Sequence, residues 1–273
     1  MAWMILALVS GVLNALWTST IKGRTGGLSP AAFAAVIRLG VGLAFLPFLL
    51  AHMPQFGIRW WALAAAAGVA ESLSLAFSVR GYSEDYYSTY AVSNTNPVLV
   101  VLLGWALLGE RMDWGLGLGV ALAAAGSLVL FFRGHVNRWG LGAAAAVALS
   151  KVASKAGLSD GSALAQASAA FLSGGLVLAA VDRFRGPGLN PGPLLRELWP
   201  RRLFIVGSAL TTACAFEAMA LGPAGGVALL SRSNLLVGFL LSYYGLDERR
   251  DWRGRALGAA LILLGLALAA WRI

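Results

Sequence analysis

Long apolar segments recur along almost the whole chain and are separated by short polar connections. A helix needs about 20 residues to cross a hydrocarbon core roughly 30 Å thick, and the segments are close to that length. They are continuously apolar and rich in Ala, Leu and Gly, whereas the strands of a membrane barrel would be about 10 residues long and would alternate in polarity. The pattern therefore predicts an all-α integral membrane protein with ten transmembrane helices. The predicted helices span residues 2–20, 28–51, 57–79, 86–108, 115–133, 139–156, 162–181, 202–221, 224–244 and 253–271.

The composition agrees with this pattern and argues against several kinds of site. Of the 273 residues, 59% are hydrophobic and 12% are charged, about half the charged fraction that is usual for a soluble domain. Cys214 is the only cysteine, so neither an intramolecular disulfide nor a cysteine metal cluster can form. His52 and His135 fall in predicted loops, and no nucleophile elbow or P-loop occurs. We therefore expect no enzyme activity, no metal, no cofactor and no nucleotide hydrolysis by this chain.

Basic residues gather in alternate loops of the predicted bundle. The net charge is +9, and 14 of the 21 Lys and Arg residues fall on one side, four on the other and three within the spans. Because cytoplasmic loops are enriched in Lys and Arg, the richer side is predicted to be cytoplasmic. Both termini would then lie on the outer side of the membrane. The expected partner is the lipid bilayer, with no nucleic acid, and the expected state is a monomer or a homodimer.

One charged motif occurs twice, as GERMDW and as DERRDW, at the ends of two aligned blocks. Residues 93–114 and 231–252 share nine identities in 22 positions without a gap. The motif follows the fourth span in one block and the ninth in the other, so each half holds five spans. Because five is odd, the second half crosses the membrane in the opposite sense. The sequence therefore predicts two inverted five-helix repeats, residues 1–133 and 137–273, an arrangement typical of secondary transporters. Glu110 and its neighbours lie at the water boundary, where we expect them to fix a turn between helices.

With these features the chain resembles the EamA-type, ten-helix branch of the drug/metabolite transporter superfamily. The resemblance rests on the five-plus-five layout, on NPVLVVLLGWALLGER with Pro97 and Glu110, and on ALGPAG at residues 220–225. It implies a secondary transporter that works by alternating access, with a central cavity lined by helices one, three, four, six, eight and nine. Pro97 would be a gating residue. The chain departs from the pattern at Leu235, where a proline would match Pro97, so the two gating helices would flex unequally.

The resemblance implies transport of small polar organic metabolites, with amino acids or related zwitterions as the leading substrate class and with export favoured. An organic-cation, quaternary-amine or drug carrier is an alternative, in which Glu71, Trp17 and Tyr90 would form a cation site. A non-transporting membrane scaffold is the alternative of a different class. It would have a dry core in which all intramembrane charges pair with one another.

Five ionisable side chains fall inside the predicted spans, where a charge at the helix centre costs about 2.5 kcal/mol or more. They are Arg38, Glu71, Lys151, Glu217 and Arg232. Glu71 is either a carboxylate that binds a proton or an amine, or the salt-bridge partner of Arg38. Lys151 either binds a substrate carboxylate or snorkels to the surface. Arg232 either grips a carboxylate or pairs with one of the two glutamates, and Glu217 has a gating or a structural role. Three cations against two carboxylates leave one positive charge for a substrate anion.

Polar residues also form a stripe on the fourth predicted helix. Tyr90, Asn94 and Pro97 recur at spacings of four and three, which places them on one face. Asn14 and Trp17 share a face of the first helix, where Trp17 either stacks on an ammonium or packs against its neighbours. The predicted substrate-binding residues are Asn14, Trp17, Arg38, Glu71, Tyr90, Asn94, Asn96, Lys151, Glu217, Arg232 and Asn234.

Overall fold

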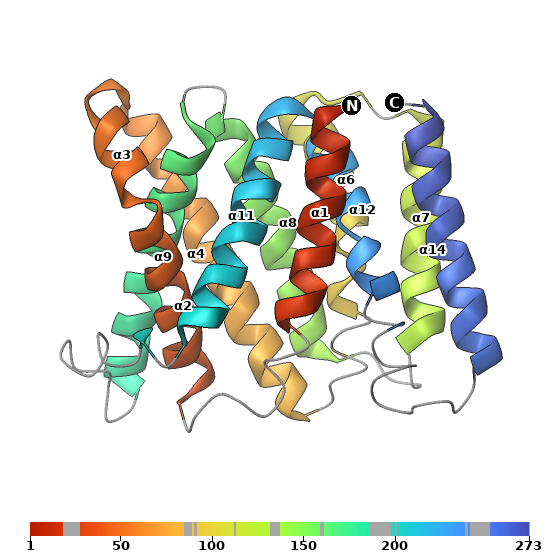
Figure 1. Cartoon of the computed structure of the whole chain (residues 1–273), viewed down its shortest axis with the longest axis horizontal. Helices are drawn as coiled ribbons and strands as arrows, with labels where there is room; N and C mark the ends of the chain where they lie inside the picture. Colours follow the sequence, from red (N-terminus) through yellow and green to blue (C-terminus); the bar gives the residue numbers. More distant parts are fainter. Residues whose placement is uncertain are drawn as a thin grey trace.

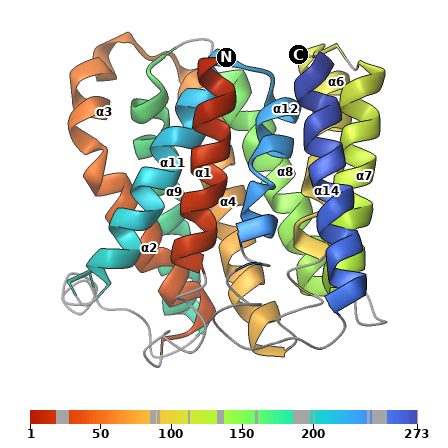
Figure 2. The same cartoon turned by 45° about the vertical axis from the view of Figure 1, so that its right-hand side comes forward.

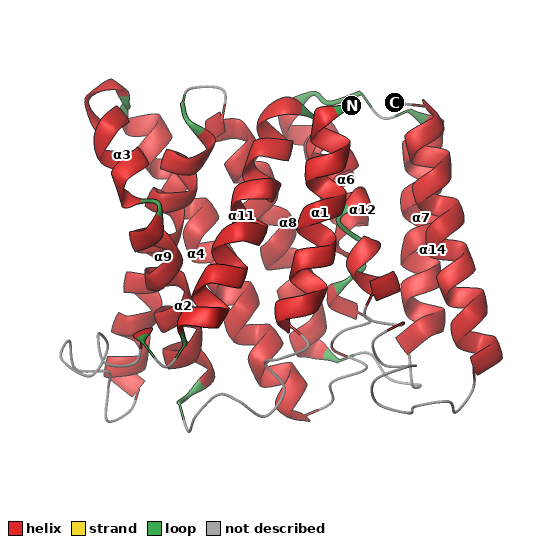
Figure 3. Cartoon of the chain, in the orientation of Figure 1, coloured by secondary structure: helices red, strands yellow, loops and turns green. Residues whose placement is uncertain are grey.

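A computed structural model describes most of the chain as a bundle of helices (Figure 1). The described residues are 1–18, 28–84, 89, 92–111, 113–131, 137–158, 161–185, 198–199, 201–237, 240 and 252–272. Within them, only the backbone is described for Trp17, Thr18, Pro30, Pro54, Leu130, Phe131, Arg185 and residues 252–256 and 269–272. The regular structure of the described chain is helical throughout, without a strand (Figure 3).

The order of the helices follows the order of the predicted spans. The elements are α1 (Ala2–Thr18), α2 (Pro30–Ala44), α3 (Leu46–His52), a 3₁₀ turn (Met53–Gln55), α4 (Ile58–Glu84), α6 (Asn96–Leu108), α7 (Trp114–Phe131), α8 (Arg138–Leu158), α9 (Ala163–Arg185), α11 (Arg202–Leu221), α12 (Ala224–Leu230) and α14 (Trp252–Arg272). Local signals set some of these ends. The Ser29 hydroxyl accepts from the backbone N–H of Ala32 at 3.0 Å and caps α2, and Gly109 ends α6 with a left-handed φ of 66°.

Each predicted span contains one of the apolar helical segments. Four helices of the described chain, α4, α8, α9 and α11, are long and apolar enough to cross a membrane by themselves. The pair α2 and α3, bent by 53°, is long and apolar enough when taken as one broken span, and five shorter apolar helices lie within the other predicted spans. The predicted fold class, an all-helical membrane protein built from two repeats, is confirmed.

The helices that carry the two aligned blocks are both interrupted inside the bundle. In the first half, a turn at residues 94–95 precedes α6. In the second half, α12 is followed by a turn at residues 231–232, and the helix resumes at residues 233–237. The two interruptions share one pair of aligned positions, Asn94 and Arg232. Discontinuous helices of this kind form the binding sites of many transporters with inverted repeats.

Pro97 explains the first interruption, but no proline explains the second. Pro97 has no N–H to donate to the carbonyl of Ser93, four residues earlier. The side-chain amide of Asn96 donates to that carbonyl instead, at 2.8 Å. The second helix is interrupted although Leu235 stands where a proline would match. The interruption therefore does not require proline. Unequal flexing of the two gating helices and the gating role of Pro97 stay predictions.

The contacts between helices obey the pseudo-two-fold symmetry that relates the two five-helix halves. α7 packs along α14 and α2 packs along α9, so the fifth and second spans each contact their own counterparts. The contact of α4 with α8 is matched by the contact of α11 with α1, as exchanging the halves requires. α1 begins and α14 ends at the same end of the bundle in Figure 1, as an even number of spans predicts. Figure 2 shows α7 and α14 side by side at one edge of the molecule.

Glycines permit the closest helix contacts in this bundle. A Cβ atom added to Gly68 of α4 would lie 1.7 Å from the backbone oxygen of Ala170 in α9. A Cβ atom added to Gly126 of α7 would lie 2.6 Å from the backbone oxygen of Gly258 in α14. In lipid, close van der Waals contact drives helix association because the hydrophobic effect between helices is lost. The pairs α4–α9 and α7–α14 therefore depend on these glycines.

Replacing Gly68 with alanine is expected to destabilise the protein, because the new methyl group would overlap the backbone of α9. We expect the free energy of unfolding to fall by about 1–3 kcal/mol, the usual cost of overpacking. Gly117→Ala is the matched control, since no atom lies within 4 Å of its Cβ position and alanine favours a helix. Reversible unfolding of the purified protein in SDS measures both variants, and equal stability would contradict this account of the α4–α9 contact.

Candidate functional site

A cavity of about 220 Å³ lies between the helices of the two halves. Side chains from α1, α4, α8, α11 and both interrupted helices line it, as the family resemblance implied, and α2 and α9 contribute Arg38 and Phe171. The volume is below the roughly 300–1,000 Å³ typical of sites for drug-sized ligands, so the cavity fits a molecule smaller than these. The Ser and Thr residues of the lining are Ser10, Ser74, Ser78, Ser93, Ser150, Ser154, Ser208, Thr211, Thr212 and Ser231.

Eight of the eleven predicted substrate-binding residues line this cavity. They are Asn14, Arg38, Glu71, Asn94, Asn96, Lys151, Arg232 and Asn234. The side chain of Trp17 and the whole of Tyr90 lie outside the described part of the chain. The structure thus brings most of the candidates to one place, and their roles in binding stay predictions.

Glu217 is not among the cavity-lining residues, in contrast to its predicted place in the site. α11 presents Ser208, Thr212, Ala215 and Met219 to the cavity. These positions recur every three or four residues and form one face of the helix, whereas Glu217 follows Ala215 by two residues and lies on another face. Glu71 is therefore the one carboxylate among the described lining residues. The described chain also holds no cluster of three or more His, Cys, Asp and Glu side chains that could bind a metal.

Arg38 and Glu71 form an ion pair at one side of the cavity. Arg38 Nη2 lies 3.0 Å from Glu71 Oε1, which joins α2 to α4. The guanidinium also stacks over the ring of Phe171 in α9, 4.6 Å from its centroid. The salt-bridge alternative for Glu71 is thus correct, but both partners also face the cavity. A structural bond and a substrate contact are compatible at this position.

Arg232 connects the two interrupted helices. Its guanidinium donates to Asn94 Oδ1 and, at 3.0 Å, to Asn96 Oδ1, while its Nε donates to the carbonyl of Ala228 at 3.4 Å. Asn94 is the residue that aligns with Arg232 in the repeat, so two equivalent positions meet at the centre of the molecule. Three buried side chains, Arg232, Asn94 and Asn96, therefore hold the breaks of both halves together.

Lys151 and Lys155 lie one turn apart on α8 and have different surroundings. Lys151 is half-buried, lines the cavity and interacts electrostatically with Arg232 and Glu71. The side chain of Lys151 therefore reaches the cavity and does not snorkel to the surface, which was the other predicted alternative. Lys155 donates instead to the carbonyls of Met219 and Gly222, at 2.6 and 2.8 Å. Lys151 is therefore the lysine that this helix presents to the cavity.

Lys155 and Glu110 hold the turn between α11 and α12 from two sides. Lys155 binds the last carbonyls of α11, and Glu110 Oε1 accepts from the first N–H of α12, at Ala224, over 2.8 Å. A cation at a helix C-terminus and a carboxylate at an N-terminus both complement the helix dipole. Glu110 thus has a structural role at a turn, but the turn that it binds lies in the other half and is not the predicted one at the end of its own helix. The role of Lys155 had no signal in the sequence, because its acceptors are backbone carbonyls.

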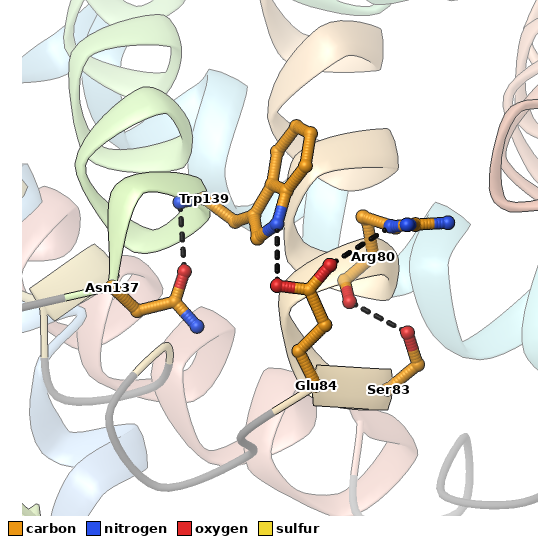
Figure 4. Close-up of polar contacts among 5 residues, drawn as sticks. All are labelled: Arg80, Ser83, Glu84, Asn137 and Trp139. Carbon is orange, nitrogen blue, oxygen red and sulfur yellow. Dashed lines mark hydrogen bonds and ion pairs between the residues drawn. The ribbon is translucent and has the colours of Figure 1, made fainter.

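A second polar cluster joins the two halves where α4 ends and α8 begins (Figure 4). Glu84 accepts from Trp139 Nε1 at 2.8 Å and from Arg80 Nε at 3.1 Å. Asn137 Oδ1 accepts from the backbone N–H of Trp139 at 2.8 Å and caps α8. Sequence analysis did not predict this cluster, since its members lie 55 residues apart and occur in different repeats.

Comparisons with known proteins agree with this architecture. The sequence matches the EamA-like transporter family over residues 1–132 and 137–271. A search of curated proteins found no match. Among solved structures the chain is similar to one described as "Crystal structure of protein", with a TM-score of 0.70 and 20% identity over 99% of this chain and 96% of the other. At that identity the likeness shows the fold alone.

Asn96→Ala is expected to lower stability, because it removes an acceptor from the buried Arg232 guanidinium and a donor from the freed carbonyl of Ser93. We expect a loss of about 2–3 kcal/mol in the free energy of unfolding, typical of leaving a buried charged donor unsatisfied. Asn96→Asp keeps an oxygen acceptor for Arg232 and should lose less. Thermal unfolding in detergent compares the two, and identical melting temperatures would contradict the role given to this contact.

Glu110→Ala is expected to reduce stability by about 0.5–2 kcal/mol, the usual effect of losing a side-chain helix cap, here that of α12. Glu110→Gln keeps an oxygen that can accept from Ala224 and should lose less. Arg111→Ala serves as the control, since Arg111 is the next residue in the chain and is exposed. The same thermal measurement applies, and a Glu110→Ala protein as stable as the control would show that the cap contributes nothing.

Proposed function

Since the chain belongs to the EamA-like transporter family, and is therefore a membrane transporter of the drug/metabolite type, we propose that it carries small polar organic metabolites by alternating access. Amino acids and related zwitterions are the first candidate substrates, and export is the proposed direction. The proposed location is a bacterial inner membrane, with both termini in the periplasm. A proton or substrate gradient would drive this secondary transport.

The charged lining of the cavity is the observation that carries the proposal. Arg38, Lys151 and Arg232 bring cations to the cavity, and Glu71 brings a carboxylate. Charged side chains are costly inside a bilayer, and those that face a cavity mark substrate pathways. The surrounding hydroxyls and amides add donors and acceptors for a polar molecule. The cations suit the carboxylate of a zwitterion, and the amide and hydroxyl groups suit its other polar atoms.

Alternating access is supported by the two interrupted helices that meet at this cavity. Each half contributes one interrupted helix, and the two breaks lie at aligned positions joined through Arg232 and Asn94. Rocking of one repeat against the other around such a junction would expose the same lining residues first to one side and then to the other. The proposed binding site therefore coincides with the proposed pivot.

Two other functions fit the cavity less well. A carrier of organic cations needs carboxylates that are free to bind the ligand, whereas Glu71, the one carboxylate among the described lining residues, is bonded to Arg38. A scaffold without transport activity would have a dry core, whereas here a cavity is lined by charged, amide and hydroxyl groups. The small-metabolite carrier remains the proposal.

Exchange of labelled amino acids in proteoliposomes tests the proposal. We expect wild-type protein to exchange at least one amino acid, and Glu71→Gln to slow that exchange by roughly tenfold or more, because Arg38 would be left as an unpaired buried cation. Glu217→Gln, which changes a glutamate of α11 outside the cavity lining, should stay within roughly twofold of wild type.

Gel filtration and thermal unfolding of each variant establish that slow exchange does not reflect misfolding. The proposal fails if the wild-type protein exchanges no amino acid. The assignment of the cavity fails if the Glu71 and Glu217 variants lose activity equally.

A further inference from the structure

We propose that Lys151 binds the carboxylate of the substrate, and that the carrier selects its substrates for a carboxylate and not for an amino group. This inference rests on the proposed function, because it concerns the same cavity. It narrows the substrate class from small polar metabolites to organic carboxylates, with amino acids as one kind among them.

Lys151 and Lys155 differ in what their ammonium groups contact. Lys155 uses its ammonium on two backbone carbonyls, at 2.6 and 2.8 Å, and so belongs to the scaffold. One turn earlier, Lys151 faces the cavity, and no described residue hydrogen-bonds to it or forms an ion pair with it at contact distance. A half-buried ammonium inside a membrane span needs a counter-ion or an acceptor. The cavity is the place from which such a group can reach it.

The carboxylate of Glu71 already has a partner in the cavity wall. Its carboxylate already binds Arg38 at 3.0 Å, and the arginine is buried and stacked on Phe171. A substrate ammonium would have to share Glu71 with Arg38 or displace it, and breaking a buried ion pair is strongly unfavourable. No described residue forms an ion pair with Lys151 at contact distance, so a substrate carboxylate would break no such pair among the described residues. The amino group of an amino acid is therefore tolerated in the cavity without being required.

The described lining of the cavity carries an excess of positive charge. It contains three cations, Arg38, Lys151 and Arg232, and one carboxylate, Glu71. The sequence alone predicted an excess of one positive charge, because it counted Glu217, which does not line the cavity. The described groups thus carry two more positive than negative charges. Cavities lined by an excess of one sign attract ligands of the other, and the effect grows as water is excluded.

A set of three matched compounds separates the two functional groups of an amino acid. For phenylalanine, the set is completed by phenylpyruvate, which keeps the carboxylate and loses the amine, and phenethylamine, which keeps the amine and loses the carboxylate. If Lys151 is the anchor, phenylalanine and phenylpyruvate bind and phenethylamine does not. An ammonium-recognising site would give the reverse order for the last two compounds.

The experiment measures competition by these compounds against the labelled amino acid that the wild-type carrier exchanges fastest, using the set built on that amino acid. We expect the keto acid to compete within roughly threefold of the amino acid, and the amine to be at least roughly tenfold weaker. Lys151→Gln should weaken competition by both acids by roughly tenfold or more and leave the amine unchanged. Lys151→Arg keeps the charge and should restore most of the competition by the acids.

Each outcome bears on the inference in a definite way. Competition by the amine as strong as that by the keto acid overturns it, while exchange by the wild type would leave the proposed function standing. Equal losses for all three compounds in Lys151→Gln also overturn it, because a structural lysine would act so. If Lys151→Gln does not fold, the wild-type carrier still decides, since stronger competition by the keto acid than by the amine supports selection for the carboxylate and the reverse order opposes it. A wild-type carrier that exchanges no amino acid removes both proposals.

Discussion

The two interrupted helices can meet inside the bilayer only because their polar groups find partners within the protein. Hydrocarbon offers no hydrogen bonds, so each unpaired backbone group or buried charge at that depth is costly. The Arg232 guanidinium meets this requirement for both halves together, because it binds the amide oxygens of Asn94 and Asn96 from across the repeat. This contact therefore joins the interrupted helices of both halves at the lining of the cavity.

That contact also requires the two repeats to differ where they meet. Asn94 and Arg232 occupy aligned positions and touch each other, so they lie on either side of the pseudo-two-fold axis. Two arginines there would repel each other, and two asparagines would leave the junction without a charge. One donor and one acceptor solve the problem. The symmetry of the fold is therefore preserved in the backbone and abandoned in the side chains at its centre.

The sequence could predict what depends on local pattern, namely the apolar spans, the repeat and the candidate residues at aligned positions. It could not place Glu217, because the face that a helical residue presents has meaning only once the neighbouring helices are known. Nor could it find the partners of Lys155, since the carbonyls of Met219 and Gly222 leave no side-chain signal. The pairing of Arg38 with Glu71 was an open alternative, because spacing alone does not measure a distance between helices.

Lys155 and Glu110 hold the α11–α12 turn, and the lysine has no match in the other repeat. The offset of 138 residues that aligns Asn94 with Arg232 pairs Lys155 with Trp17, whose indole has no ammonium to offer. A carrier with identical halves would have two orientations of equal free energy. For the proposed carrier, we expect the unmatched lysine to make the two orientations unequal in free energy, and the substrate concentrations that half-saturate it from the two sides of the membrane to differ.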